Sequence, residues 1–293
     1  MYYPITYHEP LFRPPSEAYS LILQPTIGCS WNRCAFCEMY TSKKFSVRDI
    51  EDVKAEVRAM TEHRDHVRKV FLADGNAMVL PFDYLLDLLN ELKSIFPRLT
   101  RVSAYALPKD LLGKTDDELL KIFEAGMKLI YVGIESGDDA VLQMVKKGET
   151  HATTVKGLLK AKKAGIKSSV MILSGLGGKK YSRQHAEHSA QLVNAVQPEF
   201  LSTLVLSYPH GLDHFVKRFK GDFEPCDIPD LLQEMKTFVS NTELDRTVFR
   251  SDHASNYLIL KGTLGREKER MLQEIDAAID QPGGLRPEWM RGL

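Results

Sequence analysis

Residues 70–96, VFLADGNAMVLPFDYLLDLLNELKSIF, contain one complete strand, turn and helix. The apolar run Val70–Ala73 predicts a strand, and the Asp-Gly-Asn sequence at 74–76 is typical of a turn. Apolar residues then recur every three or four positions over Phe82–Phe96, which predicts a helix with one apolar face. Strands that alternate with helices form parallel sheets, so repeats of this unit would predict one parallel sheet.

The same unit recurs on both sides of this stretch. Further strands are predicted at Leu21–Ile27, Val102–Leu107, Leu129–Glu135, Ser168–Leu173 and Phe200–Ser207. Helices are predicted at Asp49–Arg64 and His151–Ala164. A third helix is predicted to begin at a capping box formed by Thr115 and Glu118 and to end at Gly126, and a fourth to begin at an N-cap at Ser182. Six such units predict an α/β fold, a three-quarter parallel (β/α)6 TIM-like barrel with its site at the carboxyl ends of the strands.

Beyond Pro209 the alternation fades, leaving a helix near Leu231–Val239, a short run at Thr247–Arg250 and a helix at Arg266–Asp280. We therefore expect an N-terminal arm (1–20), a core barrel (21–211) and a C-terminal extension that closes the barrel (212–293). The chain has 39 basic and 39 acidic residues, so it has no overall field that attracts nucleic acid or a membrane. With no signal peptide and no long apolar run, it is predicted to be soluble and cytoplasmic.

Three of the four cysteines lie close together in QPTIGCSWNRCAFCEMY, residues 24–40, directly after the first predicted strand. Cys29, Cys34 and Cys37 are spaced C-x4-C-x2-C. Three thiolates on a four-iron cluster leave one iron open, and the amino and carboxylate groups of S-adenosylmethionine (SAM) can chelate it. The alternative is a closed zinc site with Cys226 as the fourth ligand.

The loop resembles that of the radical SAM superfamily, whose usual pattern is C-x3-C-x-aromatic-C. Cys34-Ala35-Phe36-Cys37 matches the second half, and the first gap is one residue longer. The resemblance implies that Cys29, Cys34 and Cys37 hold a 4Fe–4S cluster and that the backbone at Phe36 approaches the adenine of SAM. Cys226 is then not a ligand, because the open iron is needed for SAM.

Later strand ends resemble other elements of the superfamily, in the same order. LIYVGIESG (129–137) resembles the G-x-E-S-G element of the branch that contains Elongator catalytic subunits, methylthiotransferases and coproporphyrinogen-dehydrogenase-like proteins. The resemblance implies that Glu135 binds the ribose of SAM, although an acid here can also cap a helix. The resemblance also implies further SAM contacts: Asp74, Gly75 and Asn76 with the amino group, Ser169 with the methionine carboxylate, and Leu173 with the adenine.

The implied activity is reductive cleavage of SAM to a 5′-deoxyadenosyl radical that acts on a small-molecule substrate. An electron donor such as flavodoxin or ferredoxin is expected. The reaction that follows SAM cleavage is an oxidation or reduction, a group transfer or a rearrangement. One alternative is an RNA-modifying enzyme of the same family, which would bind RNA through basic residues such as Lys43, Lys44, Arg48, Lys179 and Lys180. Another is a zinc-stabilised binding module.

Residues 249–257, FRSDHASNY, are dense in groups that can hydrogen-bond or transfer protons. We expect this segment to close the barrel mouth between two helical stretches. Arg250, His253 and Tyr257 would face the substrate, joined by Tyr208 from the sixth strand, with His253, Tyr257 and Tyr208 as catalytic candidates. The alternative is a polar loop in which Asp252 or Ser255 caps a helix.

Overall fold

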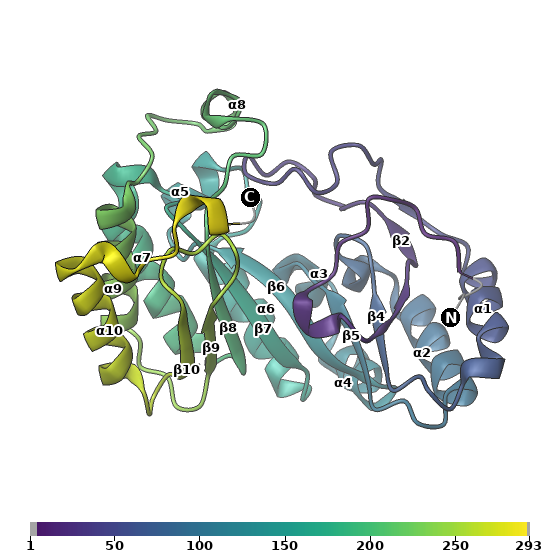
Figure 1. The fold of residues 1–293 in the computed structure, drawn as a ribbon. Helices are drawn as coiled ribbons and strands as arrows, with labels where there is room; N and C mark the ends of the chain where they lie inside the picture. The colour runs from purple at the N-terminus through teal and green to yellow at the C-terminus, as the bar shows by residue number, and fades with distance from the viewer. Residues whose placement is uncertain (1–4, 292–293) are drawn as a thin grey trace. The chain divides into compact units, whose positions relative to one another are not determined.

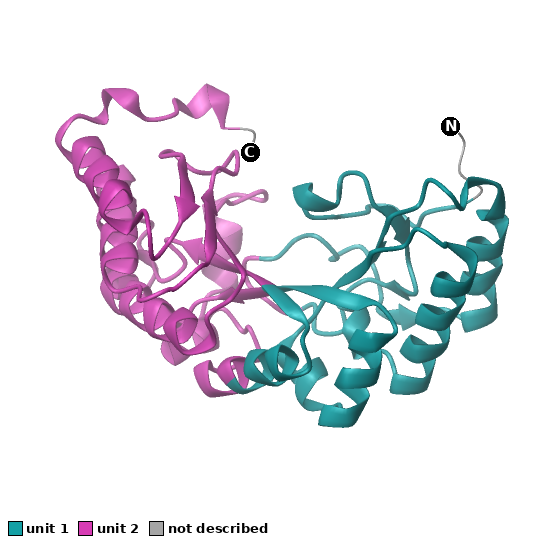
Figure 2. Cartoon of the chain, turned by 90° about the horizontal axis from the view of Figure 1, so that it is seen from below, with its two compact units in different colours: residues 1–32, 37–132, 156–168 teal, residues 33–36, 133–155, 169–293 magenta. Residues whose placement is uncertain are grey.

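The computed structural model describes residues 5–291. The first four residues of the predicted arm and the last two of the predicted extension lie outside this range. The chain divides into two compact units, in each of which helices line one side of the strands (Figure 2). Unit 1 comprises the residues up to Asn32, Cys37–Val132 and Lys156–Ser168; unit 2 comprises Arg33–Phe36, Gly133–Val155 and the residues from Ser169 onward.

Unit 1 is built on parallel strands in the order β1-β4-β5-β6 (Figure 1). These strands are β1 (Leu21–Leu23), β4 (Lys69–Leu72), β5 (Arg101–Tyr105) and β6 (Met127–Glu135), of which β6 ends in unit 2. Their side chains are buried on both faces, as expected for parallel strands. Tyr7 and Leu11 of the predicted arm pack against Ile22, Phe71 and Tyr131 on one of these faces.

The helices of unit 1 follow the predicted periodicity. They are α1 (Ile50–Ala59), α2 (Phe82–Ile95), α3 (Pro108–Leu112), α4 (Asp116–Glu124) and the end of α6 (His151–Lys163), with 3-10 turns at Pro15–Glu17, Thr61–His63 and Ala77–Val79. The capping box is confirmed: Thr115 is the N-cap of α4 and exchanges hydrogen bonds with Glu118. Gly126 and Gly165, which follow α4 and α6, have φ values of 126° and 90°, as predicted for residues that end helices.

Unit 2 contains the strands β7 (Lys167–Ser174), β8 (Phe200–Val205), β9 (Val248–Ser251) and β10 (Leu260–Thr263) in sequence order, with β7 entering from unit 1. β7, β8 and β9 are parallel, and β10 is antiparallel to β9. The helices are α5 (Asp139–Met144), α7 (Gly178–Val196), α8 (Leu212–Arg218), α9 (Ile228–Ser240) and α10 (Lys268–Asp280), with 3-10 turns at Pro282–Gly284 and Glu288–Met290. The mostly parallel α/β arrangement is therefore confirmed.

The structure corrects two local predictions. The first predicted strand is two strands, because Thr26–Ile27 (β2) leaves β1 and pairs with Ser46–Val47 (β3). Ser182 is not an N-cap: α7 begins at Gly178, and the Ser182 hydroxyl donates to Glu234 Oε2 at 2.6 Å. The segment 249–257 lies between α9 and α10, as predicted, and forms most of β9 and its connection to β10.

β9 and β10 raise the six predicted sheet strands to eight, and both come from beyond residue 211. The domain ranges stay a prediction, since the two compact units divide the chain differently. Within residues 5–291, no helix has the length and apolar character needed to span a membrane.

Candidate functional site

Cys29 and Cys37 are half-buried in unit 1, whereas Cys34 is buried in unit 2 and Cys226 is half-buried there. In the described part of the chain, no three His, Cys, Asp or Glu side chains form a group that could hold a metal ion. The prediction that Cys29, Cys34 and Cys37 are ligands therefore rests on their spacing in residues 28–37, which we call the cysteine loop.

In unit 1, Asp74 supports the start of the cysteine loop. Its carboxylate is fully buried just after β4. Oδ2 accepts hydrogen bonds from the Gly28 backbone N–H at 3.1 Å and from Lys43 Nζ at 2.7 Å, and Oδ1 accepts one from Gln24 Nε2 at 3.3 Å. Because a buried carboxylate needs donors, these bonds fix the backbone next to Cys29.

Gly75 and Asn76 support the same loop. A Cβ on Gly75 would lie 2.6 Å from the Gly28 carbonyl oxygen and would also meet Cys29, so only glycine fits. Asn76 Oδ1 accepts from the Ser30 backbone N–H at 3.0 Å, and Asn76 Nδ2 donates to Ser30 Oγ at 2.9 Å and Asp110 Oδ2 at 2.8 Å. The Asp-Gly-Asn sequence thus holds the backbone of the loop in place. Its contact with SAM stays a prediction.

Tyr40 is a residue that sequence analysis missed. It follows Cys37 by three positions and is buried in unit 1, yet its hydroxyl has no hydrogen-bond partner among residues 5–291. Burial raises its pKa well above the usual range, and the negative charge of Asp74 acts in the same direction. Tyr40 is therefore a neutral phenol with an unused donor. Its position after the last cysteine was the only signal in the sequence.

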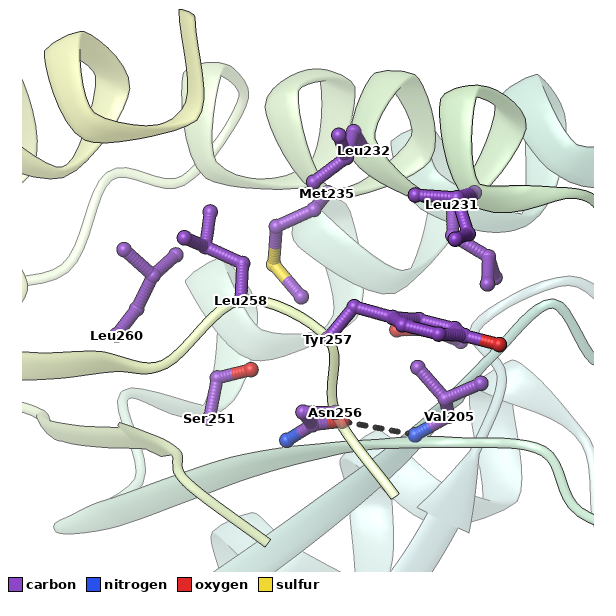
Figure 3. Close-up of a pocket in the computed structure, with 11 residues that line it drawn as sticks. Val205, Leu231, Leu232, Met235, Ser251, Asn256, Tyr257, Leu258 and Leu260 are labelled. Carbon is purple, nitrogen blue, oxygen red and sulfur yellow. Dashed lines mark hydrogen bonds between the residues drawn. The ribbon is translucent and has the colours of Figure 1, made fainter. Parts of the chain in front are cut away.

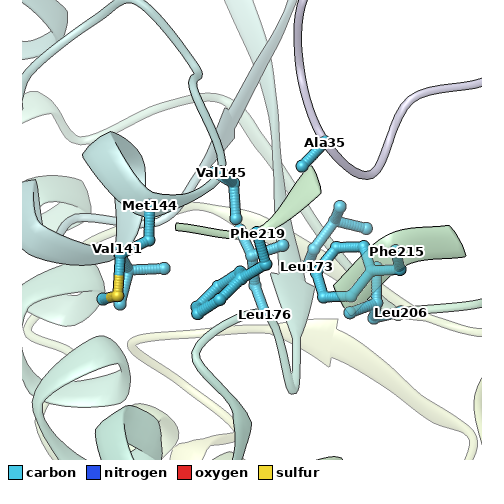
Figure 4. Packing of buried hydrophobic residues seen from close by; sticks show 9 residues of the cluster. All are labelled: Ala35, Val141, Met144, Val145, Leu173, Leu176, Leu206, Phe215 and Phe219. Carbon is cyan, nitrogen blue, oxygen red and sulfur yellow. The ribbon is translucent and has the colours of Figure 1, made fainter. Parts of the chain in front are cut away.

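In unit 2, backbone contacts hold the middle of the cysteine loop. The Ala35 N–H donates to the Val145 carbonyl at 2.8 Å, and Arg218 Nη2 of α8 donates to the Cys34 carbonyl at 2.8 Å. Ala35 packs into an apolar cluster that includes Leu173 and Phe215 (Figure 4).

The same cluster brings together three predicted site residues. Leu173 is a member, and Phe36 and Tyr208 pack against it. The Tyr208 ring lies edge-on to Phe215, with 5.4 Å between ring centroids. By contrast, Ser169 lies beside Phe200 near the start of its strand, roughly 13 Å along the strand from Leu173, so its predicted contact does not enter the function proposed below.

Glu135 ends β6 with a φ of 63°, which is uncommon for a residue with a side chain. Its carboxylate is buried in unit 2, with Oε1 accepting a hydrogen bond from Lys147 Nζ at 3.2 Å. Oε2 is buried and has no partner among the described residues. Burial raises the pKa of Glu135, while the Lys147 ammonium lowers it. Glu135, the residue predicted to bind ribose, therefore has one buried oxygen that can accept a hydrogen bond.

The segment after β9 supports the end of β8. Asn256 Oδ1 accepts from the Val205 N–H at 2.9 Å (Figure 3), and Asn256 Nδ2 donates to the Thr203 carbonyl at 2.7 Å. The Tyr257 hydroxyl donates to Glu288 Oε2 at 3.1 Å. Its ring lines a pocket with Leu231 and other apolar side chains of α9.

The remaining predicted residues of this segment lie close by. His253 Nδ1 lies 2.9 Å from Ser255 Oγ, and burial, together with the charge of Arg286, lowers the pKa of His253. Arg250 is exposed on β9. Neither Asp252 nor Ser255 caps a helix, because no helix begins there.

The basic residues of the RNA-binding alternative are mostly paired with acids. Lys43 contacts Asp74 at 2.7 Å, and Arg48 contacts Glu56 at 2.7 Å. Lys179 lies within 3.4 Å of Glu224, Asp227 and Asp230, and Lys180 lies 3.9 Å from Asp222. These acids neutralise the positive charges that would otherwise bind the phosphates of RNA.

Cys226 lies in surroundings that disfavour its thiolate form. Burial, reinforced by the negative charge of Glu234, raises the pKa of its thiol to about 12.

Comparisons with known proteins agree on one family. The model of the radical SAM superfamily matches residues 23–193, more than half of the chain. A curated relative from Methanocaldococcus jannaschii, named "Putative methylthiotransferase", is 27% identical over 149 residues, which are 48% of this chain and 32% of the relative. The chain thus spans about a third of the length of that relative.

Two solved structures show the likeness in fold. Coproporphyrinogen III oxidase of Escherichia coli, described as a radical SAM enzyme, gives a TM-score of 0.58 at 18% identity, over 75% of this chain and 52% of the other. A radical SAM methyltransferase of Kitasatospora setae, solved with cobalamin and a 4Fe–4S cluster, gives 0.52 at 18% identity, over 64% of this chain and 36% of the other. These matches confirm the predicted fold class and the resemblance.

The partnerless Tyr40 hydroxyl leads to a stability prediction. In the metal-free protein, Tyr40→Phe removes an unsatisfied buried group, so the free energy of unfolding should stay unchanged or rise by up to ~1 kcal/mol. The matched control is Tyr131→Phe, because the Tyr131 hydroxyl donates to Glu17 at 2.6 Å. That loss should lower the free energy of unfolding by about 1.5–3 kcal/mol. Urea unfolding of both variants measures this, and an equal loss in both would show that the Tyr40 hydroxyl is satisfied.

Proposed function

Because the chain belongs to the radical SAM superfamily, we propose that it is an enzyme that cleaves SAM reductively to start radical chemistry on a small-molecule substrate. Members of this family use a 4Fe–4S cluster and SAM. When bound, the cluster supplies the electron that breaks a carbon–sulfur bond of SAM and releases the 5′-deoxyadenosyl radical. The chain's own residues hold these two cofactors and keep water away.

The observation that carries this proposal is the buried Oε2 of Glu135, which has no partner among residues 5–291. A buried acceptor without a donor is costly, and a bound ligand that brings a hydroxyl removes that cost. The ribose of SAM offers two such hydroxyls. The position of Glu135 also supports this contact, since carboxylates that follow parallel strands bind ribose in other nucleotide sites.

We assign the cluster to Cys29, Cys34 and Cys37. Their spacing matches that of cluster ligands, and the hydrogen bonds of Asp74 and Asn76 hold the backbone on either side of Cys29. Three protein ligands leave one iron for the amino and carboxylate groups of SAM.

We assign the amino group of SAM to the Asp74-Gly75-Asn76 end of β4. A carboxylate offers about four lone-pair sites, and the donors at Asp74 are three: Gln24, Gly28 and Lys43. The remaining site can accept a hydrogen bond from an ammonium group. In unit 2, the apolar surface at Phe36 and Leu173 suits the flat adenine ring.

On the substrate side we propose Tyr208, His253 and Tyr257. Burial raises the pKa of Tyr208 above its usual range and lowers that of His253, so both side chains are neutral near pH 7 and can exchange a proton or a hydrogen bond. A small molecule is favoured over RNA because acids pair with four of the five basic residues named for RNA. We further propose a cytoplasmic location and an electron donor such as flavodoxin or ferredoxin.

The first test is iron binding. Anaerobically reconstituted protein should be brown and hold four irons, and Cys29→Ala, Cys34→Ala and Cys37→Ala should each abolish this, because two thiolates hold a cluster poorly. The matched control is Cys226→Ala, which should retain the iron. Iron analysis and absorption spectra measure the result. One tightly bound zinc in place of iron in the parent protein would overturn the proposal.

The second test is SAM affinity. Glu135→Ala should weaken SAM binding while iron content stays the same, since the side chain contacts ribose and not the cluster. Losing a hydrogen bond to a charged acceptor costs about 1.5–3 kcal/mol, or roughly ten- to a hundredfold in affinity. Calorimetry on the reconstituted protein measures this. An unchanged affinity would remove Glu135 from the site.

The third test separates substrate from cofactor. His253→Ala and Tyr257→Phe should bind SAM as tightly as the parent protein but lose product formation, because the proposed contacts are to substrate. The assay uses the fraction of a metabolite extract that stimulates 5′-deoxyadenosine release by the parent protein. Full stimulation in both variants would place the substrate contacts elsewhere.

A further inference from the structure

Lys147 is a buried charge to which the proposed function gives no role. Its side chain is only 7% exposed, and its Nζ lies 3.2 Å from Oε1 of Glu135, whose side chain is 5% exposed. Taking either charge out of water alone is costly, so each depends on the other. The pair lies in unit 2 together with Phe36, whose ring centroid is 5.8 Å from Lys147 Nζ.

The backbone of Lys147 is fixed by the end of α5. The Lys147 N–H donates to the Leu142 carbonyl at 2.9 Å, and the Lys146 N–H donates to the Gln143 carbonyl at 3.1 Å. Lys146 has a φ of 57° in the left-handed region. These features form a Schellman motif, which ends the helix with a defined geometry. The backbone of Lys147 is therefore held in a defined conformation.

Gly133 makes room for the pair above β6. A Cβ at this position would collide with Glu135 Oε1 and would lie 3.5 Å from Lys147 Nζ. The left-handed backbone of Glu135, with a φ of 63°, is a second unusual feature at the same place. Uncommon backbone conformations of this kind gather at functional sites.

The two oxygens of Glu135 are treated differently. Lys147 occupies Oε1, whereas Oε2 is buried without a donor among residues 5–291. Burial raises the pKa of Glu135, and the Lys147 ammonium acts in the opposite direction. A ligand hydroxyl that reaches Oε2 thus meets a carboxyl group whose orientation is set by the hydrogen bond from Lys147.

We propose that Lys147 is a positioning residue for SAM: it holds the Glu135 side chain by Oε1 and so presents Oε2 to a ribose hydroxyl. This inference rests on the ribose contact proposed for Glu135. Lys147 acts through Glu135 and does not itself contact SAM. Its removal should therefore matter only while the carboxylate is present.

A double-mutant cycle on the reconstituted holoenzyme tests this, with SAM affinity measured by calorimetry. Glu135→Gln and Lys147→Met should each weaken SAM binding about tenfold, and the double variant should be within about threefold of the weaker single variant. Iron content should stay the same in all four proteins, because the cluster is assigned to the three cysteines and not to this pair. Lys147→Arg keeps the charge and should bind SAM within about threefold of the parent protein.

Lys146→Met is the matched control, since it removes a neighbouring positive charge from the same turn but leaves the pair with Glu135 intact. Its SAM affinity should be that of the parent protein. If Lys147→Met does not fold, Lys147→Gln replaces it in the cycle. Equal losses from the Lys147 change with and without Glu135 would overturn this inference alone. An unchanged affinity in Glu135→Gln would remove the ribose contact itself, and the inference with it.

Discussion

A carboxylate that is removed from water must find donors, and the start of the cysteine loop depends on this constraint. Asp74 is fully buried, and its donors come from the residue before Cys29, from Lys43 and from Gln24. Lys43 Nζ also donates to the Pro10 carbonyl at 2.8 Å. One acid at a strand end thereby joins the N-terminal arm, β4 and the loop.

The two units use the same device at different strands. In unit 1, Asp74 follows β4 and pairs with Lys43; in unit 2, Glu135 ends β6 and pairs with Lys147. The difference lies in how many donors each acid has. Donors reach both oxygens of Asp74, whereas one oxygen of Glu135 has no donor among residues 5–291. Under the proposed function, Asp74 supports the loop and keeps one site for the amino group of SAM, whereas Glu135 offers a whole oxygen to the ribose.

The region beyond residue 211 illustrates what sequence patterns miss. β9 has four residues, and its burial alternates because Arg250 is exposed, so it lacks the continuous apolar run that marked the other strands. It joins the sheet because its backbone pairs in parallel with β8, and Asn256 then holds the end of β8 from the following connection. Pairing of this kind depends on backbone hydrogen bonds, and these are hard to predict from the side chains of a short segment.

The local features could be predicted from the sequence: the parallel strands, the capping box at Thr115, the glycine that ends α4, and the acids and cysteines that follow the strands. These follow from side-chain periodicity and from conformational limits that act over a few residues. Two further features became visible only in the folded chain: Lys147 pairs with Glu135, twelve positions away, and the Tyr40 hydroxyl is buried without a partner among residues 5–291. The reason is physical. Burial and ion pairing depend on which segments pack together, and in the sequence a lysine or a tyrosine is the same whether water or protein surrounds it.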